Sequence, residues 1–458
     1  MWFGRSTARA TTLGDPLDSS QAYEAPASLG QRLLWFMDHY RGEDGALNCP
    51  IVFRMRGTLD LPALQRALES ITARHDSLRT TFSGRGRTLS QVVHAPGPIT
   101  LQTTDLSGAA DTERSWREHM RTELRTRMDP VVSAIRLTLW KLGTDDHVLC
   151  VNLHHLVTDG QSYGIFVQEL HQLYDRAVGI PRELAAVQWQ YPDYARWENA
   201  QLNTAEFQRH LTYWQQQLRD ARMPSLPFRP RSGDTPRQRE TQACELSSEV
   251  VERLRQLARA RRSTLYSVML SIFYVLLHRI SGDRDISVSS VFVNRHLPQV
   301  QHTMGFFANL LVLRTQTSSS ACFSDVLRSC HAVVTDAFVH QSVSYYMLPP
   351  HLMRETEVRF DEVVFQMTQP VYRGAMGAMQ VDVLTVEGVG NRFDFELTII
   401  SKENTLTPVV SYNHSRVPRD WAHGFLSRYV RLASHLSLYP DARIRDLDVS
   451  VDSPRDLA

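Results

Sequence analysis

The stretch His154-His-Leu-Val-Thr-Asp-Gly160 lies between two segments with different periodicity. Residues 147–153, which precede it, are rich in apolar and β-branched side chains and predict a strand. After it, apolar residues recur at spacings of three and four, which predicts an amphipathic helix. These residues are Tyr163, Phe166, Leu170, Leu173 and Tyr174. The stretch therefore joins a strand to a helix, and the backbone N–H groups at the start of that helix favour negative charge that develops nearby.

Four side chains of this stretch are candidates for chemistry. Strand alternation directs His155 to the face of Leu153 and His154 to the opposite face, so only one of the two histidines can easily act on a substrate. Asp159 can organise the bend by accepting hydrogen bonds from the backbone or from an arginine, and Gly160 permits a tight turn or the close approach of a ligand. An isolated histidine pair at a strand end is more often structural than catalytic. The complete seven-residue pattern favours catalysis at His155.

Length and composition narrow the class of protein. A chain of 458 residues is about three times the usual domain length of ~150 residues, which predicts two lobes. Its 50 Lys and Arg against 49 Asp and Glu argue against a nucleic-acid binder with a broad basic surface. The five cysteines form no C-x-x-C pair or metal-ligand cluster, so we expect no metal site and mostly buried, reduced thiols that suit the cytoplasm. No apolar run reaches ~18 residues, so no membrane segment is expected.

The pattern along the chain predicts an α+β fold with three regions. Residues 1–25 are small and polar and predict a flexible leader. Residues 26–180 form the expected first lobe, and residues 181–458 form the second, with the boundary at the break near residue 180. The expected helices are 28–37, 61–73, 112–127, 248–261 and 265–280, and the expected strands are 51–56, 78–82, 134–142, 147–153, 286–293, 309–314, 362–367, 381–386, 393–401 and 406–412.

The seven-residue stretch resembles the HHxxxDG signature of the condensation-domain superfamily of nonribosomal peptide synthetases and their acyltransferase relatives. Other stretches resemble the signatures of that family in the same order. They are Ala27-Ser-Leu-Gly-Gln-Arg-Leu-Leu-Trp35, Arg74-His-Asp-Ser-Leu-Arg-Thr-Thr-Phe82, Tyr191-Pro-Asp-Tyr-Ala-Arg-Trp197, Val293-Asn-Arg-His296 and Met304-Gly-Phe-Phe-Ala-Asn-Leu310 with Leu313-Arg314. His340-Gln341 matches only the start of a further signature, because Ser342 to Tyr346 replace the residues that usually follow. The order covers nearly the whole chain.

This resemblance implies two chloramphenicol-acetyltransferase-like lobes that form a V around a central tunnel. It implies a donor acyl group carried on the phosphopantetheine of a carrier protein, a small-molecule acceptor and no permanently bound cofactor. His155 would be the base for an alcohol acceptor, or would mainly position an amine. His154 and Gly160 would shape its loop, and Asp159 would form a structural ion pair with Arg295. Asn309 would either line the tunnel or satisfy buried backbone groups.

Several alternatives stay open. The chain resembles the free-standing condensation enzymes of enediyne and related antibiotic pathways, which transfer a β-aminoacyl group to a hydroxyl. A coenzyme-A-dependent O-acyltransferase is a second reading, although Phe393-Asp-Phe-Glu-Leu397 lacks the Asp-Phe-Gly-Trp-Gly motif of many such enzymes. A non-catalytic recruitment module typically lacks the paired histidines, and epimerising relatives share HHxxxDG. The acyl group, the acceptor, the choice of ester or amide and the oligomeric state do not follow from the sequence.

Overall fold

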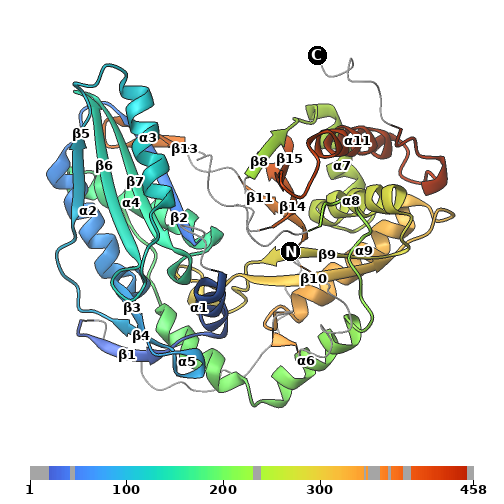
Figure 1. Ribbon diagram of the computed structural model, residues 1–458, viewed down its shortest axis with the longest axis horizontal. Helices are drawn as coiled ribbons and strands as arrows, with labels where there is room; N and C mark the ends of the chain where they lie inside the picture. Colours follow the sequence, from blue (N-terminus) through green and yellow to red (C-terminus); the bar gives the residue numbers. More distant parts are fainter. Residues whose placement is uncertain are drawn as a thin grey trace. The chain divides into compact units, whose positions relative to one another are not determined.

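The computed structural model describes residues 20–41, 47–230, 239–344, 347–348, 360, 362–369, 373–384 and 393–450 (Figure 1). The chain forms two compact units. The first contains Met1–Thr204, Arg295–Phe307 and Tyr372–Thr385, and the second contains Ala205–Asn294, Ala308–Val371 and Val386–Ala458. The structure therefore divides the chain differently from the single boundary expected near residue 180, because two later segments return to the first unit.

A six-stranded mixed sheet forms the centre of the first unit, in the order β12-β13-β2-β7-β6-β5. Its strands are β2 (Asn48–Arg56), β5 (Leu101–Asp105), β6 (Ile135–Gly143), β7 (Asp146–His154), β12 (Arg373–Met376) and β13 (Met379–Leu384). β6 and β7 form the expected hairpin, and β7 also pairs antiparallel with β2, so that Asn48 lies opposite His154. The late hairpin β12–β13 extends the sheet by pairing β13 with β2. This hairpin is one of the two segments that return from far along the sequence.

Helices cover both faces of that sheet (Figure 1). α2 (Leu61–Arg74) and α4 (Gly160–Ala177) pack against each other and bury their apolar faces with β2 and β7 in one core. α3 (Thr112–Arg125) packs against β6 and β7. Each of the three helices starts at an aspartate whose carboxylate accepts a backbone hydrogen bond from the first turn, namely Asp60, Asp111 and Asp159. The caps explain why these helices begin where the sequence predicts.

A smaller sheet includes the last residues of the expected leader, 1–25. Its strands are β1 (Tyr23–Pro26), β4 (Ser90–Val93) and β3 (Thr80–Ser83), in the order β1-β4-β3, and α1 (Leu29–Arg41) and α5 (Tyr191–Gln201) pack nearby. The hydroxyl of Tyr23 donates to Asp76, so the last residues of the expected leader are anchored in a strand. Residues 1–19 lie outside the described part of the chain. The expected strand 78–82 begins only at Thr80, because Asp76–Arg79 form a turn of 3-10 helix.

The second unit contains another six-stranded sheet, in the order β10-β9-β11-β14-β15-β8. Its strands are β8 (Arg239–Ala243), β9 (Asp285–Phe292), β10 (Asn309–Gln316), β11 (Val363–Thr368), β14 (Phe395–Ser401) and β15 (Leu406–Asn413). Its helices are α6 (Ala205–Gln217), α7 (Ser248–Ala260), α8 (Leu265–Ser281), α9 (Phe323–Val339) and α11 (Arg419–Leu438). α8 is almost entirely buried between the sheet and α9 and α11. The mixed α+β character expected for both halves is confirmed.

Two further expectations concern cysteines and membranes. None of the five cysteines, all of them in the described part of the chain, forms a disulfide. Only Cys150 and Cys330 are buried, and Cys244 is exposed, so the expectation of mostly buried thiols is wrong. No single helix among the described residues has the length and hydropathy needed to cross a membrane. The helices α7 and α8 pass that test only as a pair, bent by 104°.

Candidate active site

The paired histidines lie where β7 ends. His154 is the last strand residue and is 1% exposed, and its Nδ1 accepts a hydrogen bond from the backbone N–H of Leu156 at 3.2 Å. His155 begins a turn of 3-10 helix, His155–Val157. Strand alternation therefore does not determine where His155 points, because the strand has already ended. The His154 side chain caps this turn, and His155 is its first residue.

The imidazole of His155 is held in one tautomer. Its Nδ1 lies 2.8 Å from the carbonyl oxygen of Thr158. Because a carbonyl oxygen only accepts, Nδ1 must carry the hydrogen, and in the neutral ring Nε2 then carries the lone pair. The ring of Phe306 meets the imidazole edge-to-face, with centroids 4.8 Å apart and an interplanar angle of 68°. The half-buried ring of His155 is thus oriented from both sides.

Asp159 is fully engaged in structural contacts. One carboxylate oxygen accepts from the backbone N–H of Ser162 at 2.7 Å, as the cap of α4, and the other accepts from the N–H of Phe307 at 3.0 Å. Arg295 donates to the first oxygen at 3.3 Å, and the side chains of Asp159 and Arg295 are 1% and 4% exposed. The expected pairing of Asp159 with Arg295 is therefore present in the structure. Through these contacts the carboxylate joins the start of α4 to Phe307 and Arg295.

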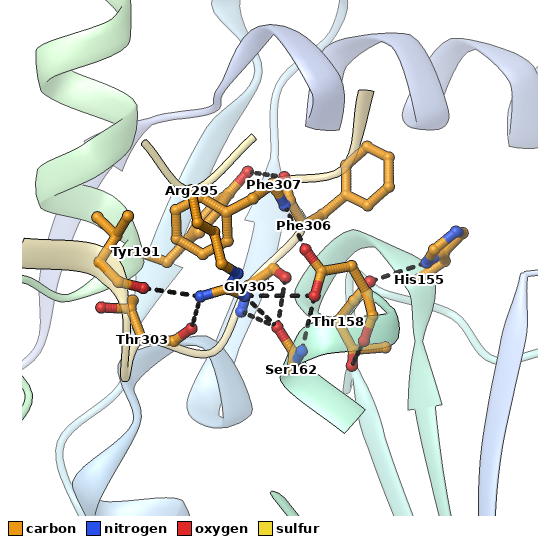
Figure 2. A network of polar contacts seen from close by, with 11 residues as sticks. His155, Thr158, Ser162, Tyr191, Arg295, Thr303, Gly305, Phe306 and Phe307 are labelled. Atoms are coloured by element: carbon orange, nitrogen blue, oxygen red, sulfur yellow. Dashed lines mark hydrogen bonds and ion pairs between the residues drawn. The ribbon is translucent and has the colours of Figure 1, made fainter. Parts of the chain in front are cut away.

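Arg295 links its own segment, Arg295–Phe307, to the start of α4 (Figure 2). Its Nη1 donates to the carbonyl oxygens of Val300 and Thr303 at 2.8 and 2.6 Å. Its Nη2 donates to Ser162 Oγ at 2.8 Å, and its guanidinium lies 4.0 Å from the ring centroid of Phe307. Figure 2 also shows His155 at the edge of this network, apart from the guanidinium. The network fixes segment Arg295–Phe307 onto the loop that carries His155.

Sequence reasoning missed Ser162, which is completely buried at the centre of the network. Its hydroxyl donates to the carbonyl oxygen of Gly305 at 2.8 Å and accepts from the Gly305 N–H at 3.0 Å. The sequence offered one signal for Ser162: it lies three residues after Asp159, and the backbone N–H at that position is the usual donor to a helix N-cap side chain. Ser162 contributes that backbone donor and a hydroxyl as well.

The site contains two glycines, Gly160 and Gly305, and the structure requires a glycine at only one of these two positions. Gly160 has no left-handed φ, and a Cβ built on it would meet nothing within 4 Å, so neither a tight turn nor packing explains it. A Cβ on Gly305 would lie 1.9 Å from Cδ2 of Tyr191. Tyr191 also donates from its hydroxyl to the carbonyl oxygen of Phe306 at 2.5 Å. Of these two positions, Gly305 requires glycine because the Tyr191 ring packs against its Cα, whereas Gly160 borders open space.

Asn309 lies in the second unit, at the start of β10. It is 6% exposed, and its Nδ2 donates to the carbonyl oxygen of Gln341 at 2.7 Å. This contact matches the structural alternative for Asn309, and the tunnel-lining role stays a prediction. Within the described ranges, no three His, Cys, Asp or Glu side chains are arranged to hold a metal ion.

Comparison with known proteins identifies the family of this chain. The condensation-domain family model matches residues 21–456. The chain belongs to the condensation-domain family. As a condensation domain, it is 31% identical over 447 residues to chondramide synthase cmdD of Chondromyces crocatus, covering 94% of this chain and 11% of the relative. It is 30% identical over 402 residues to malpibaldin synthetase of Mortierella alpina, covering 84% of this chain and 7% of the relative. The chain thus spans only a small part of the length of these curated relatives.

Solved structures share the fold of this condensation domain. The X-domain from teicoplanin biosynthesis, solved in complex with OxyB, superposes with a TM-score of 0.83 at 23% identity, covering 96% of this chain and 100% of that one. The SgcC5 protein from Streptomyces globisporus superposes with a TM-score of 0.75 at 23% identity, covering 91% of this chain and 100% of that one. The first condensation domain of the calcium-dependent antibiotic synthetase, in complex with a substrate analogue, gives 0.77 at 20% identity, covering 94% and 99%.

Proposed function

We propose that this condensation domain transfers an acyl or aminoacyl group from the phosphopantetheine thioester of a carrier protein to a hydroxyl or amine of a small molecule in natural-product biosynthesis. The observation that carries the proposal is the contact between His155 Nδ1 and the Thr158 carbonyl oxygen. This contact leaves the lone pair on Nε2, which is the form of histidine that can take a proton. The contacts of His154 and Asp159 support the same loop.

With an alcohol acceptor, His155 acts as a general base. The acceptor oxygen attacks the thioester carbonyl carbon while Nε2 takes the hydroxyl proton. The tetrahedral intermediate then expels the phosphopantetheine sulfur, and the proton on Nε2 passes to that sulfur, so that it leaves as the thiol and the His155 ring is neutral again. General-base help of about 10²–10⁴-fold corresponds to ~3–5 kcal/mol, and alignment of the two substrates contributes ~7–11 kcal/mol. Alignment is therefore the larger effect, and His155 serves both.

An amine acceptor needs less from the base. A free amine attacks a thioester readily, and only the resulting ammonium must lose a proton, so His155 would mainly position it. We favour the alcohol and the free-standing, enediyne-pathway form, with a β-aminoacyl donor. The SgcC5 protein, which this chain matches over the whole length of that protein, was solved in complex with a naphthyl ethanediol, and this supports testing vicinal diols as acceptors.

The scaffold residues have separate proposed roles. Asp159 and Arg295 hold the loop of His155 against segment Arg295–Phe307 through buried contacts. Gly160 leaves open space at the start of α4, where a Cβ would meet nothing within 4 Å, and a substrate group can approach the helix N–H donors there. Asn309 would line the path of the substrate only if its bond to the Gln341 carbonyl oxygen opens.

The test offers carrier proteins loaded with α- and β-aminoacyl thioesters, together with matched alcohol and amine acceptors, and detects product by mass spectrometry. We expect His155→Ala to lower turnover with an alcohol at least ~100-fold. His94→Ala, at an exposed histidine, is the matched control and should keep full activity. Undiminished turnover by His155→Ala would refute the general-base role.

The same assay separates the alternatives. Turnover with acyl-coenzyme A but not with carrier thioesters would replace the proposal by the coenzyme-A-dependent reading. An X-domain that was solved in complex with OxyB shares this fold, so a wild-type chain that transfers nothing but binds a partner protein would instead favour a recruitment module. Inversion of the donor α-carbon without transfer would favour an epimerising relative.

A further inference from the structure

The N-terminal part of α1 contains a buried amide that the function above does not use. Gln31 is 0% exposed, and its Oε1 accepts from the backbone N–H of Ser28 at 3.0 Å. Its Nε2 donates to the carbonyl oxygen of Leu156 at 3.0 Å and to Gln91 Oε1 at 3.1 Å. Leu156 is the residue that follows His155. The amide of Gln31 therefore reaches directly into the turn that carries the histidine.

The orientation of this amide is fixed by its partners. The Ser28 N–H can only donate and the Leu156 carbonyl can only accept, so exchanging the oxygen and nitrogen of Gln31 would break both bonds. Gln91 is also 0% exposed and donates from Nε2 to the carbonyl oxygen of Pro26 at 2.9 Å. Only one arrangement of the two amides satisfies every group. The pair acts as a rigid spacer between β1, α1 and the turn.

A second set of contacts connects the N-terminal end of α1 to Phe306, which packs against the ring of His155. Ser28 Oγ accepts from the backbone N–H of Gln31 at 3.0 Å and lies 2.8 Å from the hydroxyl of Tyr191. Tyr191 in turn donates to the carbonyl oxygen of Phe306. A Cβ on Gly30 would lie 2.9 Å from the Phe306 ring, so α1 also supports that ring directly. Phe306 is the residue that meets the imidazole edge-to-face.

We propose that the first turn of α1 sets the position of the His155 imidazole, with Gln31 as a positioning residue. Gln31 holds the Leu156 carbonyl on one side, and Ser28 with Tyr191 holds Phe306 on the other. Movement of the Leu156 peptide would tilt the turn and shift the Thr158 carbonyl away from Nδ1. The expected effect of Gln31 on turnover rests on the proposed transferase function. Its expected effect on the position and tautomer of the His155 imidazole does not depend on that function.

The test compares Gln31→Met, which keeps the length of the side chain and loses its hydrogen bonds, with Gln65→Met. Gln65 on α2 also donates to a carbonyl, that of Ile99 at 2.9 Å, and is the matched control. The first readout is the ¹⁵N NMR spectrum of histidine-labelled protein at a pH where the ring is neutral. His155 is assigned by the signal that His155→Ala removes.

We expect wild-type His155 and the Gln65→Met protein to show the proton on Nδ1, and Gln31→Met to show a mixture of tautomers. We expect Gln31→Met to lower kcat on the order of 10- to 100-fold with little change in KM, because misplacement of a catalytic group by about 1 Å has effects of that size. In the His155→Ala background the same substitution should change kcat less than about twofold, because residues that act through one another are not additive.

Two results would overturn the proposal. One is an unchanged His155 tautomer in Gln31→Met, and the other is an equal loss of kcat in both backgrounds, which would indicate a purely structural role. If Gln31→Met does not fold, Tyr191→Phe tests the second arm, since it removes only the hydroxyl that donates to Phe306, and the same two readouts apply. If the wild-type protein shows no transferase activity, the NMR result decides the positioning role alone.

Discussion

Removing either partner of the ion pair between Asp159 and Arg295 should lower the free energy of unfolding by several kcal/mol. Both side chains are almost fully buried, and they lie 3.3 Å apart. Arg295→Met would leave the carboxylate with two backbone donors and no cation, and would leave the Val300 and Thr303 carbonyls without their donor. Removing one partner of a buried pair costs about 3–5 kcal/mol. Asp159→Ala should cost at least as much, because it also removes the cap of α4, worth ~1 kcal/mol.

The two substitutions should not be additive. In the double variant neither charge is left uncompensated, so its free energy of unfolding should exceed the value expected from the sum of the two losses by about 1–3 kcal/mol. Urea-induced unfolding measures all four free energies, and hydrogen exchange of α4 locates the change. Arg114→Met breaks an exposed pair with Glu118 and is the control that should leave unfolding unchanged. Strict additivity, or a loss below ~1 kcal/mol for Asp159→Ala, would refute the reasoning.

Three further substitutions test burial and packing. Burial raises the pKa of Glu198 in the folded protein, so its contribution to stability is lost as pH rises through that pKa. Glu198→Gln should therefore gain stability relative to wild type as pH rises above about 4, the usual pKa of a glutamate, and a difference that stays constant with pH in thermal melts would contradict this. Burial lowers the pKa of His171 to about 4, so the folded protein holds this ring neutral. Wild type should lose stability from about pH 6.5 down to pH 4 more steeply than His171→Leu does, and parallel curves would show that the ring titrates normally. Gly305→Ala places a methyl group 1.9 Å from the Tyr191 ring and should cost ~1–3 kcal/mol in urea unfolding, whereas Gly160→Ala should cost far less.

The local pattern of the sequence predicted most helices and strands, because periodicity and capping act over a few residues. The helix starting at Gly160 and the hairpin β6–β7 are examples. The sequence could not predict that β13 pairs with β2, since a short alternating strand carries no signal for a partner more than three hundred residues away. The same limit applied to β1, a strand of four residues that pairs with β4 about seventy residues further along the chain.

The site was predictable in its residues but not in its geometry. The resemblance to condensation domains indicated His155 and the pairing of Asp159 with Arg295. The tautomer of His155 depends on the Thr158 carbonyl, and that carbonyl is in reach only because the strand ends one residue earlier and a 3-10 turn begins. Ser162 was missed because a serine in the first turn of a helix is usually a surface residue. Gln31 lay inside a recognised stretch, but its bond to Leu156 crosses from one segment to another.

The pairing of β13 with β2 also has a consequence for how the protein is made. A ribosome completes β2, β7 and the histidine loop long before it reaches Leu384, so the outer edge of β2 must wait for its neighbour during translation. An unpaired edge strand with apolar residues is a site for aggregation. We expect nascent chains that end near Thr204 to need a chaperone that covers the exposed edge of β2. Shortened fragments that end at the same place should aggregate when they are expressed.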